Sequence, residues 1–290
     1  MSLVSLKEVL QDARSGKYAV PMFDVSNPTM IRIAVEVAEE ENSPVILAAI
    51  EPDLVGGRMA FWAGAAQMAA MAARVPVAFM IDHAATFELC ARCAENGFTG
   101  VMIDASAKPL AENVALTRQV CEAMHRRGVS VEAELGHVGD AEAGSGEGEL
   151  AGASGDTAVY TEPGDVVDFV ERSGCDALAV SIGTAHGVYR TAPRLKIDLL
   201  KELNAASKVP LVLHGGSGTP DDQIREAIAN GVTKINICSE IMFAWHDTML
   251  KVLRETPNLS FWDAKAVVEP EAAMREVMRR KIRLFGSARG

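Results

Sequence analysis

Eight short apolar runs recur along this chain, and a segment with helical character follows each of them. The runs occupy residues 18–23, 44–50, 75–83, 101–103, 129–134, 177–182, 209–213 and 234–238. Runs of this length between breaker residues are typical of strands buried on both faces, as in a parallel sheet. Eight strand-helix units in 290 residues favour a closed (β/α)8 barrel, or TIM barrel, over an open doubly wound sheet. We therefore expect one barrel domain over residues 1–290, with an additional helix at 269–284.

Polar side chains stand where the apolar runs stop. The run at 75–83 ends on Asp82 and His83, a carboxylate beside an imidazole. The other ends carry Asp24, Asp104, Glu132, Glu134, His186, His214 and Asn236. The carboxyl ends of all strands in a (β/α)8 barrel meet at one rim, which holds the active site. These residues, although distant in sequence, are therefore candidates for a single site.

Composition and charge exclude several classes of function. A net charge of −11 argues against nucleic acid as a partner, because nucleic-acid binding needs a basic face. It does not argue against a small phosphorylated molecule, since a few local donors outweigh distant charges. No apolar run reaches the length of a membrane span, and the N-terminus lacks a signal pattern, so we expect a cytoplasmic protein that does not bind membranes. Five scattered cysteines indicate reduced thiols rather than disulfides.

Three histidines follow three different apolar runs: His83, His186 and His214. Three imidazole nitrogens at one rim can bind one Zn²⁺ and leave a coordination position open for substrate. The alternative is that each histidine is a hydrogen-bonded structural residue near the rim. Sequence spacing alone leaves both interpretations open.

Glycine-rich turns follow the last two runs. His214-Gly-Gly-Ser-Gly comes after the seventh run, and Asn236-Ile-Cys-Ser239 ends the eighth. Glycines let backbone N–H groups approach a phosphate closely, and the N-terminus of the next helix adds positive potential. The two turns together indicate a phosphate-binding site.

The segment from about 136 to 161 departs from the regular alternation. It is rich in Gly, Ala, Ser and acidic residues and has no usable periodicity. Loops of this length within a compact domain are usually functional lids or disordered segments. We expect an active-site loop here.

Six motifs in order resemble the class II, zinc-dependent ketose-bisphosphate aldolases, most closely the shorter fructose- and tagatose-bisphosphate aldolases. The motifs are Asp82-His83, Val-Met-Ile-Asp104, Val-Glu-Ala-Glu134-Leu-Gly, Ile-Gly-Thr-Ala-His186-Gly, Leu-Val-Leu-His214-Gly-Gly-Ser-Gly and Lys-Ile-Asn236. The likeness covers nearly the whole chain, including the terminal Lys-Ile-Arg-Leu-Phe-Gly-Ser.

The resemblance implies a role for each matched position. His83, His186 and His214 would bind one catalytic Zn²⁺, with a second metal or a monovalent cation possible. Asp82 would move the proton of the C4 hydroxyl, and Asp104 and Glu134 would orient the ligands or hold the metal in an alternative position. Glu142, in the long loop, would be the base for the ketose carbon. The phosphate of dihydroxyacetone phosphate would be bound by Gly187, Gly215, Ser217 and Ser239, with Asn236 on its polar oxygens.

Two positions at the ends of apolar runs depart from the family pattern. Asp24 stands where relatives carry Asn, and Ile50 where they carry Ser or Thr. Because such positions usually touch the substrate, we expect cleavage of a ketose phosphate to dihydroxyacetone phosphate and a non-standard aldehyde. A carboxylate there would repel a phosphate unless it is paired or protonated. Lys234 lies inside the eighth run, so we do not expect Schiff-base chemistry.

Other functions stay open at this point. The chain could be a fructose- or tagatose-bisphosphate aldolase proper, a non-catalytic partner subunit, or a metal-dependent sugar-phosphate isomerase or epimerase. The resemblance also implies a homodimer or homotetramer. In relatives the basic C-terminal helix can lend an arginine to the far end of the substrate, and Arg279, Arg280 and Arg283 are candidates.

Overall fold

The chain forms a closed barrel of eight parallel strands in sequential order, β1 to β8. The computed structural model describes residues 2–139, 158–258 and 262–288. The strands are β1 Val20–Asp24, β2 Val45–Ala49, β3 Val77–Ala84, β4 Gly100–Ile103, β5 Ser130–Leu135, β6 Ala177–Val180, β7 Leu211–Leu213 and β8 Val232–Ile237. Pairing of β1 with β8, for example Met22 with Asn236, closes the ring. The predicted (β/α)8 barrel with a C-terminal helix is confirmed.

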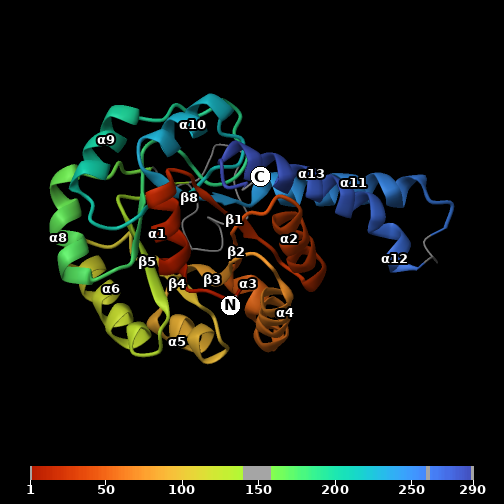
Figure 1. The fold of residues 1–290 in the computed structure, drawn as a ribbon, viewed down its shortest axis with the longest axis horizontal. Coiled ribbons are helices and arrows are strands. Elements are labelled where there is room, and N and C mark those ends of the chain that lie inside the picture. The colour runs from red at the N-terminus through yellow and green to blue at the C-terminus, as the bar shows by residue number, and fades with distance from the viewer. Residues whose placement is uncertain (1, 140–157, 259–261, 289–290) are drawn as a thin grey trace.

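Helices surround the ring of strands (Figure 1). In chain order they are α1 Leu6–Gly16, α2 Pro28–Glu40, α3 Glu51–Leu54, α4 Arg58–Ala72, α5 Phe87–Glu95, α6 Leu110–His125, α8 Pro163–Ser173, α9 Ile197–Ala206, α10 Asp221–Ala229, α11 Ser239–Glu255, α12 Asp263–Ala266 and α13 Val268–Leu284. None of these described helices is long and apolar enough to cross a membrane.

The strands are buried on both faces, and two hydrophobic clusters divide these faces. Outward-pointing residues such as Phe23, Phe79 and Val131 pack against the surrounding helices. Inward-pointing residues such as Met22, Met80 and Met102 fill the barrel interior. Alternate positions along a strand face opposite sides, so each strand contributes to both clusters. This two-sided burial explains the unbroken apolar runs in the sequence.

Helix α1, which the strand-helix pattern did not predict, closes the end of the barrel where the strands begin. Leu6, Leu10 and Ala13 of α1 belong to the same cluster as the inward-pointing strand residues, and α1 lies across the ring of strands (Figure 1). The helix begins with a capping box, in which the Ser5 hydroxyl accepts from the Glu8 N–H and the Glu8 carboxylate accepts from the Ser5 N–H.

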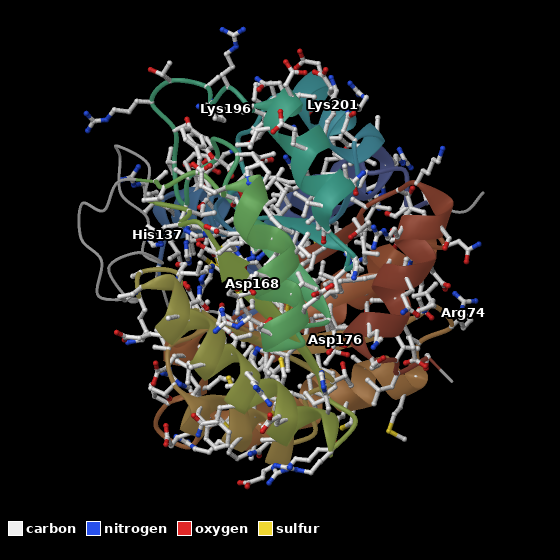
Figure 2. The ribbon with its side chains drawn as sticks, turned by 90° about the vertical axis from the view of Figure 1, so that its left-hand side faces the viewer. Arg74, His137, Asp168, Asp176, Lys196 and Lys201 are labelled. Atoms are coloured by element: carbon white, nitrogen blue, oxygen red, sulfur yellow. The ribbon has the colours of Figure 1, made fainter. Side chains whose placement is uncertain are left out.

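The two ends of the barrel are chemically different. Asp176, just before β6, lies 3.1 Å from Lys7 Nζ of α1 and 2.8 Å from His125 Nε2. His137 follows β5 at the other end, and Figure 2 shows it to the left of Asp176, which precedes β6. The candidate functional residues lie at the end marked by His137.

Helices α11 and α13 pack along each other and extend beyond the ring, with α12 between them in sequence (Figure 1). Helix α13 also packs against α2 and β1, which anchors this pair to the barrel. The additional C-terminal helix predicted at 269–284 corresponds to α13.

Candidate active site

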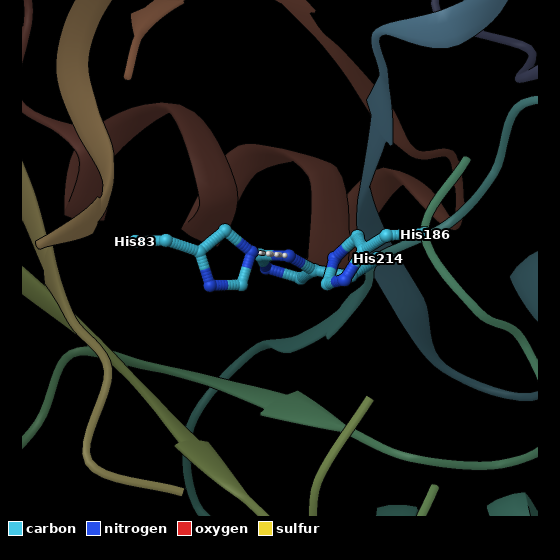
Figure 3. Close-up of side chains that lie close together, drawn as sticks. All are labelled: His83, His186 and His214. Atoms are coloured by element: carbon cyan, nitrogen blue, oxygen red, sulfur yellow. Dashed lines mark hydrogen bonds between the residues drawn. The ribbon is translucent and has the colours of Figure 1, made fainter. Parts of the chain in front are cut away.

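Three histidine rings meet at the rim where the strands end (Figure 3). His83 belongs to β3, while His186 and His214 follow β6 and β7. The ring centroid of His83 lies 4.8 Å from that of His186 and 4.7 Å from that of His214, and the centroids of His186 and His214 are 5.7 Å apart. Each ring offers a nitrogen, and these nitrogens all lie within 4.8 Å of one another. The three predicted zinc ligands therefore share one small volume.

A local irregularity of β3 directs the His83 ring toward this point. His83 has a φ of 48°, a left-handed conformation in which histidine is tolerated better than most residues. The pairing of β3 with β4 shifts register between Ile81 and Ala84, as expected at a bulge. On the far side of the ring, His83 Nδ1 lies 2.8 Å from Asp104 Oδ2. Because an ionised carboxylate only accepts, this contact places the proton on Nδ1 and turns Nε2 toward the other histidines.

His214 is oriented in the same way by a carboxylate deeper in the barrel. Its Nε2 lies 2.9 Å from Glu132 Oε1, and its Nδ1 lies 2.9 Å from His83 Nε2. Glu132 Oε1 also accepts from Lys234 Nζ at 2.9 Å. The side chains of His214, Glu132 and Lys234 are all fully buried.

The backbone fixes the position of His186. Its N–H donates to the Gly139 carbonyl at 2.9 Å, which joins the segment after β6 to the segment after β5. The buried Nε2 of His186 has no hydrogen-bond partner among the described residues. Because buried polar groups are normally satisfied, a buried nitrogen of this kind points to a ligand.

Glu134 provides a carboxylate beside the histidines. Its Oε1 accepts from the Val138 N–H at 2.8 Å, and its buried Oε2 has no partner in the part of the chain that the structure describes. Burial and then the nearby Asp104 raise the pKa of Glu134 to about 8. His83, Asp104 and Glu134 form a second group whose ligand atoms lie within 4.8 Å of one another.

The charges around the three rings differ. Burial lowers the pKa of both His186 and His214 well below the usual value, which keeps these imidazoles neutral, as metal ligation requires. Burial would also lower the pKa of His83, but the carboxylates of Asp82, Asp104 and Glu134 outweigh it and raise that pKa well above normal. A cation, whether a proton or a metal ion, is thus favoured at His83.

The residues present fit a divalent metal ion. Three imidazole nitrogens, on rings of which two are oriented by carboxylates on their other side, are a usual donor set for catalytic zinc. The buried Nε2 of His186 and Oε2 of Glu134 are polar atoms that such an ion would satisfy. The geometry favours the metal interpretation of the histidines over three separate structural residues.

A small cavity adjoins the histidines and collects the other predicted residues. It is lined by residues from the ends of β1, β3, β6, β7 and β8: Asp24, Asp82, His186, Gly187, Gly215, Ser217, Asn236, Cys238 and Ser239. All five residues expected at the phosphate site, Gly187, Gly215, Ser217, Asn236 and Ser239, line this cavity together with the expected acid Asp82.

The cavity has the backbone features of a phosphate site. Gly215 has a φ of 66°, and a Cβ atom there would lie 2.4 Å from the Ala185 carbonyl oxygen, so only glycine fits. The Ser217 hydroxyl accepts from the N–H groups of Cys238 and Glu240 at 3.2 and 3.3 Å, which leaves its own proton available to donate. Helix α11 begins at Ser239 and directs its positive end toward this cavity.

Two predicted residues fall outside this arrangement. Ile50 does not line the cavity: it is the N-cap residue of the short helix α3, and its N–H donates to Asp53 Oδ2 at 3.2 Å. Glu142 lies outside the described residues, as does most of the expected loop at 136–161. The described ends of that loop pair through His137 and Val159, whose N–H and carbonyl groups exchange hydrogen bonds of 2.7 and 2.9 Å.

The structure adds a residue that sequence reasoning missed. The Tyr189 hydroxyl lies 2.7 Å from the Ala185 carbonyl and 2.9 Å from the Gly215 carbonyl, and it accepts from the Ala185 N–H at 2.8 Å. It therefore joins the loops that carry His186 and His214. No motif marks Tyr189, although its place three residues after a candidate ligand was a usable signal.

Fold and site together define a (β/α)8-barrel enzyme with a candidate metal centre beside a small polar cavity. The chain belongs to the class-II fructose-bisphosphate aldolase family, whose model matches residues 4–289. The predicted family is confirmed, and the protein is accordingly an aldehyde-lyase.

Several relatives match over almost their whole length. The chain is 39% identical over 297 aligned positions to a fructose-bisphosphate aldolase of Geobacillus stearothermophilus, covering 99% of this chain and 98% of that one. It is 38% identical over 295 positions to a 6-phospho-5-dehydro-2-deoxy-D-gluconate aldolase of Bacillus licheniformis, covering 99% and 96%. Among solved structures, the YdjI aldolase of Escherichia coli K12 superimposes with a TM-score of 0.85 at 34% identity, covering 99% and 98%. Relatives that are about equally identical to this chain are thus named for different substrates.

Proposed function

We propose that this protein reversibly cleaves a ketose phosphate to dihydroxyacetone phosphate and an aldehyde other than the usual triose phosphate. The observation that carries the proposal is the shared cavity: the acid Asp82, the phosphate-site residues and the family-atypical Asp24 all line it, next to the three histidines.

The three histidines would hold a zinc ion. A divalent cation there supplies a Lewis acid that stabilises negative charge on substrate oxygens as the carbon–carbon bond breaks. Asp104 and Glu132 hold the rings of His83 and His214 in place. The cation would supply the Lewis acid, and the protein's own side chains position the substrate and move protons.

Asp82 takes the proton of the substrate hydroxyl next to the bond that breaks. Its Oδ2 accepts a hydrogen bond of 3.1 Å from Asn236 Nδ2, which orients the carboxylate. Its Oδ1 is buried and has no partner among the residues described, so it is available to a substrate hydroxyl. A rigidly held carboxylate is suited to general-base catalysis. The base for the ketose carbon in this proposal is Glu142 of the long loop.

The phosphate of the dihydroxyacetone phosphate half lies against the turn at Gly215–Ser217 and the start of α11. The Ser217 and Ser239 hydroxyls and the positive end of α11 favour an anion there. Asp24, only 4% exposed, adds a fixed acceptor to the same cavity. A carboxylate accepts from substrate hydroxyls and disfavours a further phosphate, which is the physical reason for proposing a non-standard aldehyde.

A substrate panel tests the proposal. The zinc-loaded enzyme is assayed with ketose monophosphates and bisphosphates, and dihydroxyacetone phosphate is followed with a coupled dehydrogenase. We expect at least one ketose to be cleaved faster than fructose and tagatose bisphosphates. Faster turnover of either bisphosphate than of every other ketose would refute the proposal. If that substrate were fructose bisphosphate, the result would favour the activity named for the Geobacillus relative. Absence of any three-carbon product, with interconversion of sugars instead, would indicate an isomerase or epimerase.

We also propose that the protein is a homodimer or homotetramer. The projecting helices α11 to α13 expose large apolar side chains, including Phe243 at 66% and Trp262 at 81%. Apolar patches on a projecting element are typical of association surfaces. Light scattering coupled to size-exclusion chromatography measures the mass, and a strictly monomeric protein would refute this assembly.

A further inference from the structure

A fully buried ion pair lies one layer below the candidate metal centre. Glu132 of β5 and Lys234 of β8 both point into the barrel, where the Lys234 Nζ lies 2.9 Å from the Glu132 carboxylate. Neither side chain is exposed at all. Their strand neighbours in register are the apolar residues Ala177 and Val20.

Stability does not account for this pair. Moving two charges out of water costs several kcal/mol for each ion, and apolar residues of similar volume often serve a barrel interior equally well. The inward-facing positions around the pair are filled by such residues, for example Met22, Met80 and Val212. A physical reason for the charges must therefore lie in what the pair touches.

The pair touches one of the three histidines. Glu132 Oε1 receives both the Lys234 ammonium and the Nε2 of His214, each at 2.9 Å. With the carboxylate as acceptor, Nε2 carries the hydrogen, and the lone pair of His214 is left on Nδ1. Nδ1 is the nitrogen that faces His83, 2.9 Å away. The other neutral form of His214 would direct an N–H into the ligand cluster and could not bind a cation there.

Lys234 contributes a second effect. Asp82, Glu132 and His214 form a further group whose ligand atoms lie within 4.8 Å of one another, deeper than the three-histidine group. The Lys234 ammonium already contacts the Glu132 carboxylate of that group at 2.9 Å. A tethered positive charge at this point disfavours a divalent ion in the deeper position and leaves the three histidines as the preferred site.

We propose that Glu132 and Lys234 are positioning residues for the metal centre, which fix the ring of His214 with Nδ1 directed at the cation. This role rests on the proposed metal centre. Residues that orient metal ligands typically change metal affinity by about 10- to 100-fold when they are removed. We expect losses of that size in zinc affinity.

The experiment measures zinc affinity of the full-length apo-protein by competition with a chelator, without substrate. The variants are Glu132→Gln, Lys234→Met and the double variant E132L/K234M. The double variant removes both charges together, so it leaves no unpaired buried charge and keeps the protein foldable if a single variant unfolds. The matched control is Lys281→Met, because Lys281 is also buried and paired with a glutamate, Glu240, but lies away from the histidines.

We expect Glu132→Gln and the double variant to bind zinc about 10- to 100-fold more weakly. Lys234→Met removes the positive charge from the Glu132 carboxylate, so it should admit the ion to the deeper group and change its coordination. Lys281→Met should lower the melting temperature of the apo-protein and leave zinc affinity unchanged. In cobalt-loaded protein, the visible absorption bands of the first three variants should change, since they report the geometry around the ion. Native zinc affinity in the folded double variant would overturn the positioning role alone. A wild-type protein that binds no zinc would overturn the metal centre and this role with it.

Discussion

Asn236 donates a hydrogen bond of 3.1 Å from its side-chain amide to Asp82 Oδ2, although 154 positions separate the two residues in the chain. The contact joins the ends of β8 and β3 across the mouth of the barrel. The same amide nitrogen lies 3.2 Å from His214 Nδ1. One side chain thus connects the proposed general base to the proposed metal centre.

The first prediction concerns this pair. Asp82→Asn should lower kcat about 10²- to 10⁴-fold, because it removes the proton acceptor. Zinc content should stay at the wild-type level, since the carboxylate is not among the three-histidine ligands. Steady-state kinetics and elemental analysis of the same preparation check both parts. Loss of zinc together with activity would assign Asp82 to the metal site instead.

Removal of His186 should abolish stoichiometric zinc binding. His186→Ala deletes one of three ligands, whereas His125→Ala deletes a histidine that contacts Asp176 at the other end of the barrel. Plasma mass spectrometry should find about one zinc per chain in wild type and His125→Ala and almost none in His186→Ala. Equal zinc in the two variants would place the metal elsewhere.

Asp24 should control which substrates are accepted. Asp24→Asn removes the negative charge from the cavity at nearly constant volume, so it should raise kcat/KM for ketose bisphosphates relative to the preferred substrate by about 10-fold, equivalent to about 1.4 kcal/mol. Ile50→Ser provides the comparison, because Ile50 does not line the cavity. An unchanged ratio in Asp24→Asn would remove Asp24 from substrate discrimination.

The ion pair of Glu240 and Lys281 should make stability depend on pH. Burial would raise the pKa of Glu240, but Lys281, the Gly218 N–H and Arg280 together lower it below its usual value. A lowered pKa means that the stabilisation is complete above the unfolded value near 4.5 and is lost as pH falls through the folded value. Glu240→Gln should therefore cost about 2 kcal/mol at pH 7 and much less at pH 3.

Urea unfolding at the two pH values measures this difference. The control is Glu122→Gln, because Glu122 and its partner Arg118 are both more than half exposed and such pairs contribute less than about 1 kcal/mol. A pH-independent cost of Glu240→Gln would contradict the ionic interpretation.

Thiol reactivity should separate Cys238 from the other four cysteines. Burial raises the pKa of Cys93 and Cys175 to about 12, and it raises those of Cys90 and Cys121 as well. Because the thiolate is the reactive form, these four should not react at pH 8 in the folded protein. Cys238 is only partly buried and lines the cavity. Titration with Ellman's reagent should give one thiol in native wild type, none in Cys238→Ser, and five in unfolded wild type.

The strand positions and the rim residues could be predicted because they depend on local patterns. Each strand is buried on both faces and so reads as an apolar run, and the carboxyl ends of parallel strands meet wherever the ring closes. Helix α1 precedes the first strand-helix unit and was missed for that reason. Its capping box of Ser5 and Glu8 and its apolar spacing at Leu6, Val9 and Leu10 would have identified it.

The remaining features depend on distant pairings. The register shift at His83 depends on how β3 pairs with β4, and no sequence pattern near His83 indicates it. The contact of Glu132 with Lys234 spans 102 positions and depends on the stagger of strands around the ring. The position of Ile50 depends on the short helix α3, which the sequence pattern did not indicate.

Among the described residues, the apolar side chains of helix α1 close the end of the barrel where the strands begin. Ions, water and sugars should therefore reach the three histidines from the rim where the strands end. Bound substrate would then cover the ion, and a chelator should remove zinc more slowly from substrate-saturated enzyme than from substrate-free enzyme.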